Sequence, residues 1–192
     1  MWVHGSCGRQ GSNPESSGCQ NEPSVFVIIY KFVKKKINEI LEDIHRYVCF
    51  FGGYFDSEFE TETKMLFERI IKGEYSIVIS DLTQNELVKA PENVRNLLYD
   101  LKIRLVDVIA VTNEEIALAT NYISEKVVGQ TSIEDCIHIA TATTNHVDLL
   151  VSWNFKHIVN VKRILGYNSV NIKNGYHILD IRSPKDLIYD ED

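Results

Sequence analysis

The sequence contains few prolines and cysteines and no long apolar segment. Four prolines in 192 residues, of which 44% are hydrophobic, exclude a collagen-like or wholly disordered chain. The longest apolar run, Val25 to Tyr30, is far shorter than the roughly 18–20 residues that span a bilayer. The cysteines form no Cys-x-x-Cys pair, which argues against a zinc site or a disulfide framework; they are Cys7, Cys19, Cys49 and Cys136. We therefore expect a protein of the reducing cytoplasm that spans no membrane, with one domain and an appendage.

Positive charge is also scarce. The formal net charge is −7 and the pI is about 5.4, so the chain as a whole repels polyanions. The charge is unevenly distributed, because residues 54–92 contain nine acids and four bases, whereas residues 151–185 contain six bases and one acid. Any nucleic-acid site must therefore be local.

Two compositions divide the chain. Residues 1–24 are rich in glycine and serine, and we expect 1–43 to be a disordered N-terminal extension and 44–192 to form the domain. Within the domain, apolar runs alternate with segments of helical period. The predicted strands are 75–80, 105–111, 149–153, 170–172 and 178–181, and the predicted helices are 58–71, 81–91, 114–127 and 133–144. This alternation predicts an α/β fold with a mostly parallel sheet, helices on both faces, and ligands at the carboxyl ends of the strands.

Glu86 is the first acid that lies where an apolar residue is expected. It shares a helical stripe with Leu82 and Ala90, in a helix that we expect Asp81 to cap. Burial of a lone charge costs several kcal/mol, roughly, unless a partner or a metal compensates for it. The alternative is a position at the rim of the core, from which the acid reaches solvent or an arginine.

Asp135 is the second such acid, in the first turn of an apolar helix that also carries His138. Its spacing of three residues from Ser132 is equally typical of a capping box, in which Ser132 caps the helix and the acid lies near the positive end of the helix dipole. His138 is then an ordinary core histidine. Spacing alone does not decide between a site and a cap.

Asn154 is the third candidate, just after the predicted strand that ends in Ser152-Trp153. An amide in this position is usually a turn former, but its oxygen can also bind a metal. Glutamate, aspartate and amide oxygens from separate elements suit a hard cation such as magnesium or manganese. Such a cation lowers the pKa of bound water and aligns it for attack on a phosphodiester, which is hydrolytic nuclease chemistry.

At these residues the sequence resembles the PIN-domain family, and in particular its VapC-like toxin branch. Three motifs carry the resemblance: Ile-Ser-Asp-Leu at 79–82 followed by Glu86-Leu87, Asp-Cys-Ile-His-Ile-Ala-Thr-Ala at 135–142, and Leu-Val-Ser-Trp-Asn-Phe-Lys-His-Ile at 150–158. The resemblance covers roughly Phe51 to the C-terminus. It implies a three-layer α/β/α fold with a parallel sheet, and an activity as a metal-dependent endoribonuclease that serves as the toxin of a toxin–antitoxin pair. It also implies Glu86, Asp135 and Asn154 as the metal-binding and catalytic residues, with Mg or Mn as the cation. Many members carry Asp at the position of Asn154, but Asn is familiar in the Trp-Asn-Phe-Lys-His subgroup.

The chain departs from the family at its first strand. Family members begin with a strand that ends in an Asp-Thr-Ser-like turn, whose aspartate is the centre of the metal site, but here residues 46–50 are Arg-Tyr-Val-Cys-Phe. One hypothesis is a shift of reading frame. If residues 44–49 are encoded ATA CAT AGA TAC GTG TGT, the next frame encodes Tyr-Ile-Asp-Thr-Cys-Val, and residues before about Phe50 would be out-of-frame translation. The alternative is a genuine extension in which an apolar strand near Tyr47 to Phe51 still pairs in the sheet.

The sequence therefore predicts a PIN-domain protein whose hydrolysis of RNA is weak or absent because the central aspartate is missing. Lys156, His157 and Arg163 are candidates for contacts with phosphate. The expected partners are RNA and a cognate antitoxin protein, and a homodimer is a further one to test, since many family members self-associate. The alternative function is a non-catalytic PIN-like module that binds an antitoxin-type protein or RNA.

Overall fold

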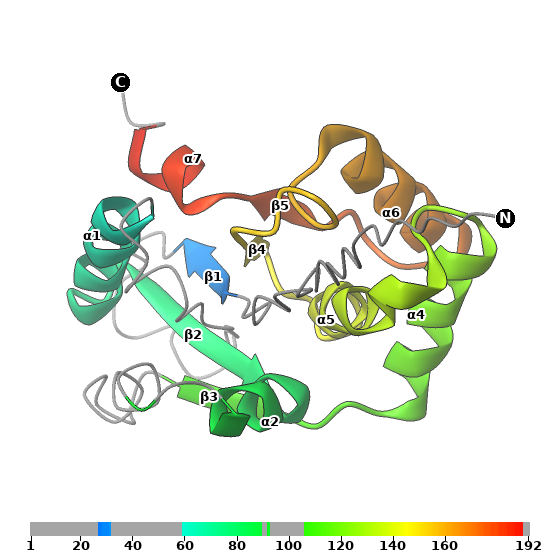
Figure 1. The fold of residues 1–192 in the computed structure, drawn as a ribbon, viewed down its shortest axis with the longest axis horizontal. Coiled ribbons are helices and arrows are strands. Elements are labelled where there is room, and N and C mark those ends of the chain that lie inside the picture. The colour runs from blue at the N-terminus through cyan, green and yellow to red at the C-terminus, as the bar shows by residue number, and fades with distance from the viewer. Residues whose placement is uncertain (1–26, 32–58, 90–91, 93–105, 190–192) are drawn as a thin grey trace, which may run out of the picture.

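The computed structural model describes residues 27–31, 59–89, 92 and 106–189 (Figure 1). In chain order the elements are β1 (Val27–Lys31), α1 (Glu60–Ile71), β2 (Tyr75–Ser80), α2 (Asp81–Lys89), β3 (Val106–Ile109), α4 (Asn113–Ser124), the 3-10 turn η4 (Gln130–Ser132), α5 (Ile133–Thr144), β4 (Leu149–Val151), α6 (Val161–Lys173), β5 (Asp180–Arg182) and α7 (Pro184–Tyr189). Among these residues, every helix is too short or too polar to cross a lipid bilayer.

The five strands form one sheet in the order β3-β2-β1-β4-β5. β2 is parallel to β3, and β4 is parallel to β5. β1 is antiparallel to both of its neighbours, with Ile29 opposite Ile77 and Val27 opposite Val151. It follows that β2, β3, β4 and β5 all run in one direction and that the central strand alone runs in the other. The expected α/β class is confirmed, and the parallel arrangement is interrupted at the central strand.

The position of β1 corrects one prediction from composition. Val27–Lys31 lie within the segment 1–43, for which we expected disorder, and yet they form the central strand. Their sequence, Val-Ile-Ile-Tyr-Lys, has the β-branched and aromatic residues that favour a strand. The remainder of 1–43 and the apolar run at 47–51 lie outside the described residues.

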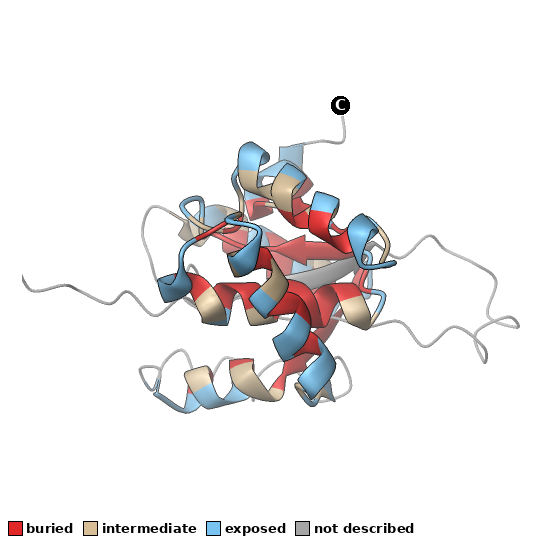
Figure 2. Cartoon of the chain, turned by 90° about the vertical axis from the view of Figure 1, so that its right-hand side faces the viewer, coloured by how far each residue is buried: buried red, intermediate tan, exposed pale blue. Residues whose placement is uncertain are grey.

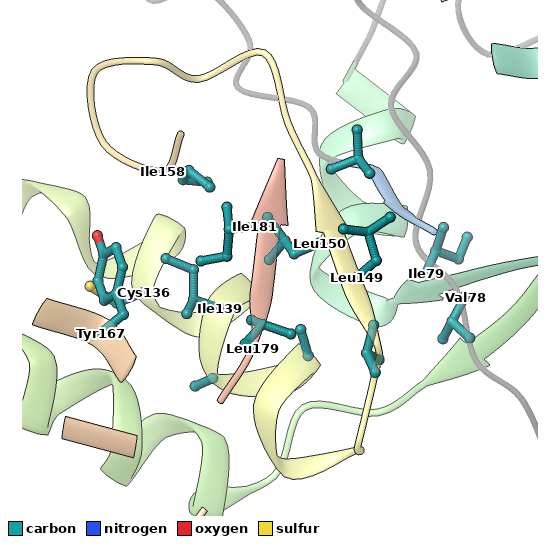
Figure 3. Packing of buried hydrophobic residues seen from close by; sticks show 14 of the residues in the cluster. Val78, Ile79, Cys136, Ile139, Leu149, Leu150, Ile158, Tyr167, Leu179 and Ile181 are labelled. Carbon is teal, nitrogen blue, oxygen red and sulfur yellow. The ribbon is translucent and has the colours of Figure 1, made fainter. Parts of the chain in front are cut away.

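Most of the helices form two groups on either side of the strands in Figure 1. α1 packs against α7 on the left, α4 packs against both α5 and α6 on the right, and α2 lies at the bottom beside β3. Between them, β2 and β4 are buried because neighbouring strands and helices cover them; Leu150 and Val151 are fully inaccessible to solvent. Figure 2 shows the buried residues concentrated in the middle of the molecule. In Figure 3, Cys136 and Ile139 of α5 lie beside Tyr167 of α6, with Leu150 and Ile181 on the adjacent strands.

Helix α6 is the largest departure from the predicted elements. The strand expected at 170–172 is wrong, because these residues belong to the helix Val161–Lys173. Asn160 caps this helix, its side chain accepting a hydrogen bond from the backbone N–H of Arg163 at 3.3 Å. Gly166 permits the helix to approach the segment after α4 closely, since a Cβ there would lie 2.8 Å from Cγ1 of Val127. A helix of low intrinsic propensity therefore forms because of its packing.

A buried polar network joins α4 to α5. Glu115 is 4% exposed and completes a capping box with Thr112 at the start of α4. Glu115 Oε2 accepts the hydrogen bonds from Thr112 in this box, and Oε1 accepts hydrogen bonds from Thr144 Oγ1 at 2.7 Å and Asn145 Nδ2 at 3.3 Å. Burial raises the pKa of Glu115, but these hydrogen bonds and those from Thr112 outweigh it and lower the pKa overall.

Candidate functional site

The carboxyl ends of β2 and β4 lie at the same edge of the sheet, because both strands run antiparallel to β1 between them. α2 follows directly on β2, and the segment Ser152-Trp153-Asn154 follows directly on β4. In open α/β sheets this edge is where ligands bind. The candidate residues of the sequence analysis are carried by these two segments and by α5.

The corner between β2 and α2 is held by side chains. Ser80 Oγ accepts a hydrogen bond from the backbone N–H of Thr83 at 3.1 Å, so Ser80, not Asp81 as expected, caps α2. Asp81 instead accepts from the backbone N–H of Val111 at 3.1 Å and connects this corner to the loop before α4. The two bonds fix the start of the helix that carries Glu86.

Glu86 points into a mostly buried environment, with 19% of its side chain exposed. Its Oε1 accepts a hydrogen bond from His138 Nε2 at 3.2 Å, and His138 is 1% exposed. Its Oε2 is buried and has no hydrogen-bond partner among the described residues. A position at the rim of the core is compatible with this partial exposure, and the partner that the described residues supply is a histidine, not an arginine.

Asp135 is 7% exposed, and its Oδ1 accepts a hydrogen bond from Asn154 Nδ2 at 3.2 Å. Burial is the main cause that raises the pKa of Asp135 to about 6; His138 and Arg163 oppose the shift, and the nearby charges of Glu86 and Glu134 add to it. The capping interpretation is wrong, because Ser132 makes no side-chain cap bond to α5. Glu86 and Asp135 are thus close enough for one carboxylate to affect the ionisation of the other.

Asn154 is oriented by two hydrogen bonds. Its Oδ1 accepts from the backbone N–H of His157 at 2.9 Å, which leaves its NH₂ group to donate to Asp135. Its own backbone N–H donates to Ser152 Oγ at 3.0 Å. The amide therefore lies beside Asp135, as expected of a site residue, but its oxygen is occupied by the turn, as expected of a turn former.

His157 and Arg163 form a second group next to Asn154. Arg163 Nη1 lies 2.7 Å from His157 Nδ1, and Ser132 Oγ lies 3.2 Å from the same nitrogen. A guanidinium can only donate, so Nδ1 accepts and the proton of the neutral ring is on Nε2. Burial lowers the pKa of His157, and the charges of Arg163 and Lys156 lower it further. Lys156 is exposed on the same loop.

The chemistry of this donor set fits a cation only in part. Among the described residues there is no group of three or more His, Cys, Asp and Glu side chains that could hold a metal ion. Glu86 and Asp135 nevertheless supply two carboxylates, one of them with a buried, unpaired oxygen, and Mg²⁺ commonly takes one or two carboxylates and keeps several waters. A third acid is lacking in the described part of the site. Because β1 is reversed, its C-terminal end, at Lys31, lies beside Tyr75 at the opposite edge of the sheet.

Sequence reasoning did not predict that Ser132, His157 and Arg163 form one group of contacts around His157 Nδ1. Only the spacing of six residues between His157 and Arg163 could have suggested this group, and a helix between 161 and 173 was not predicted.

A scan of the chain against protein-family models finds no match, and searches of curated proteins and of solved structures find none either.

Proposed function

We propose that this chain is a PIN-domain-like protein that binds a divalent cation through Glu86 and Asp135 and contacts RNA, with weak or no hydrolysis of the RNA. The observation that carries the proposal is the pair of carboxylates supplied by Glu86 of α2 and Asp135 of α5. One has a buried oxygen without a partner, and the other has a pKa raised to about 6. A cation would stabilise the unpaired oxygen of Glu86 and the ionised form of Asp135, because buried negative charge is costly when it is incompletely compensated.

The resemblance to the family supports the same assignment from the sequence. Its motifs at 79–87, 135–142 and 150–158 supply the three residues that meet at this edge, and the four strands that run in one direction are compatible with a three-layer α/β/α arrangement. Magnesium or manganese would supply an activated water for attack on a phosphodiester. Of the chain's own residues, Glu86 and Asp135 would hold the cation, Asn154 positions Asp135, and Lys156 and Arg163 would contact phosphate.

Cation binding is tested by thermal unfolding at pH 7.5 with and without Mg²⁺ or Mn²⁺, and by calorimetric titration. A ligand that binds the folded state alone stabilises it by about 1.4 kcal/mol at a concentration ten times its dissociation constant. We expect this stabilisation in the unaltered chain and its loss in Glu86→Gln and Asp135→Asn. Glu68→Gln, which removes one exposed acid from α1, is the matched control and should respond like the unaltered chain. Equal responses from all four proteins would refute the cation site.

Hydrolysis is tested separately with the double variant Tyr47→Asp/Val48→Thr, which restores the Asp-Thr pair of the family. We expect little cleavage of RNA by the unaltered chain and recovery of magnesium- or manganese-dependent cleavage by the variant. An inactive variant that still binds the cation would count against the missing aspartate as the reason for weak hydrolysis.

A non-catalytic module that binds RNA or an antitoxin-type protein is the second candidate. The specific observation in its favour is the incomplete acid set, since Asn154 presents an N–H to Asp135 and β1 runs away from the site. The cation titration separates the two candidates, because a module that only binds needs no cation at Glu86 and Asp135.

A further inference from the structure

Three aromatic side chains form a row beside the candidate site. Phe59 stacks on Trp153 with ring centroids 4.4 Å apart and an angle of 28° between the planes. Phe155 follows, 6.0 Å from Trp153 and tilted by 56°. Trp153 is 7% exposed, and its Nε1 donates a hydrogen bond to Thr63 Oγ1 at 3.0 Å. Trp153 is therefore held firmly in place, and it supports the ring of Phe155.

Phe155 is the outer member of the row and is 44% exposed. A single exposed aromatic residue is ordinary in a folded protein. This one, however, lies in the chain between Asn154, which is bonded to Asp135, and Lys156, which is exposed. Its two neighbours in the chain are thus a residue of the candidate site and an exposed cation.

A second cation lies near the row. The ammonium group of Lys185 is 6.0 Å from the centre of the Trp153 ring, close to the limit for a cation–π contact, and 3.8 Å from Glu62 Oε1. Exposed aromatic rings with cations nearby are the arrangement by which proteins bind single-stranded nucleic acids, because rings stack on bases and cations contact the backbone.

We propose that Phe155 is a platform on which one unpaired base of a single-stranded RNA stacks, with the adjacent phosphates near Lys156 and Lys185. This inference rests on the proposed function in so far as RNA is the ligand. The stacked base would hold the strand next to Asp135 and Asn154. Every base has a π-face, so the subsite accepts any base but requires an unpaired one.

The test is RNA binding without divalent cations, so that neither cleavage nor the cation site contributes. Binding of a short fluorescein-labelled oligouridylate is measured by anisotropy in EDTA, for the unaltered chain, Phe155→Leu, Phe155→Trp and the control Leu165→Ala. Leu165 is an exposed apolar residue of α6, so its variant removes a comparable surface side chain. We expect Phe155→Leu to weaken binding by about 5- to 150-fold, the range that follows from measured base–aromatic stacking, and the other two variants to bind like the unaltered chain.

An abasic oligonucleotide distinguishes stacking from a structural effect. If the ring stacks on a base, removal of the base weakens binding by the unaltered chain but has little further effect on Phe155→Leu. Fluorescence of 2-aminopurine in the strand should be quenched on binding to the unaltered chain and to Phe155→Trp, and not by Phe155→Leu. Equal affinity of Phe155→Leu and the unaltered chain, or an equal loss with the normal and the abasic strand, overturns the inference.

Failure of the platform and failure of the proposed function are separable. If a cation binds at Glu86 and Asp135 and substitution of Phe155 leaves RNA binding unchanged, only the platform is overturned. If RNA binding depends on Phe155 but no cation binds, the platform is supported and the proposed cation site at Glu86 and Asp135 is refuted. An unaltered chain that binds no RNA overturns the platform and the RNA part of the proposed function.

Discussion

Substitution of Asp135 by asparagine should stabilise the metal-free protein at neutral pH. Asp135 is 7% exposed, and its pKa is raised from 3.8 to about 6, mainly by burial. Each pKa unit corresponds to about 1.4 kcal/mol, so the ionised carboxylate costs the folded state about 3 kcal/mol at pH values well above 6. Asparagine has the same shape, carries no charge, and retains an oxygen that accepts the hydrogen bond from Asn154.

The effect must depend on pH in a defined direction. Below pH 3.8 the carboxyl group is protonated in both the folded and the unfolded state, and Asp135 and asparagine should be nearly equivalent. Between pH 3.8 and about 6 the unfolded state releases its proton while the folded state retains it, so the stability of the unaltered chain falls as the pH rises. The advantage of Asp135→Asn should therefore grow through this interval and level off above it.

Urea unfolding of both proteins at a series of pH values from 4 to 8, without divalent cations, measures this difference. Titration of other groups cancels in the comparison, because both proteins share them. Glu68→Gln removes an exposed acid from α1, which is not among the charges that shift the pKa of Asp135, and controls for the change in net charge. A constant difference over this interval, or a less stable Asp135→Asn at pH 7 to 8, would refute the assignment of a buried carboxylate that opposes folding.

Three further predictions concern single contacts. Asn154→Asp places a third carboxylate beside Asp135 and should tighten Mn²⁺ binding by about tenfold or more in calorimetry, while it destabilises the metal-free protein at neutral pH; unchanged affinity would contradict this geometry. Gly166→Ala should destabilise by about 1 kcal/mol in urea unfolding, because its Cβ would clash with Val127, and in a Val127→Ala background the same change should be neutral or stabilising. Glu115→Ala should lower the free energy of unfolding by about 1–3 kcal/mol, because it removes a capping box and the carboxylate that accepts hydrogen bonds from Thr144 and Asn145; a loss below about 0.5 kcal/mol would show that water replaces these bonds.

The elements that sequence predicted well are those whose periodicity is supported by local signals. α5 has the predicted limits, Ile133–Thr144, because apolar residues recur along most of its length. α6 was missed because asparagines and Gly166 lower its helix propensity, and packing against Val127 and the rest of the core overrides that propensity. Local helix propensity and periodicity therefore predicted α5, but they failed for α6, where close packing of Gly166 against Val127 favours a helix that the sequence alone does not.

The candidate site shows the same limit. The sequence predicted that Glu86, Asp135 and Asn154 lie at one edge of a sheet. In the structure Asn154 donates a hydrogen bond to Asp135, and the charge of Glu86 contributes to the raised pKa of Asp135. It could not predict that His138 would pair with Glu86, because only the fold brings residues 52 positions apart into contact. Nor could it predict that Ser132 would contact His157 instead of capping its own helix, since the cap signature is identical in both cases.

The direction of the central strand bears on the proposed lack of hydrolysis. The middle of the sheet requires a strand that pairs on both sides, and the sequence Val-Ile-Ile-Tyr-Lys of β1 meets this requirement in either direction. A third carboxylate for the proposed cation site has a stricter requirement, because it must lie at the edge where β2 and β4 end. β1 ends at the other edge, beside Tyr75. Pairing and hydrophobicity are thus satisfied by many sequences, whereas the position of one carboxylate depends on the direction of the strand that carries it. If the protein is PIN-like as proposed, its sheet can therefore form without the acid that hydrolysis would need.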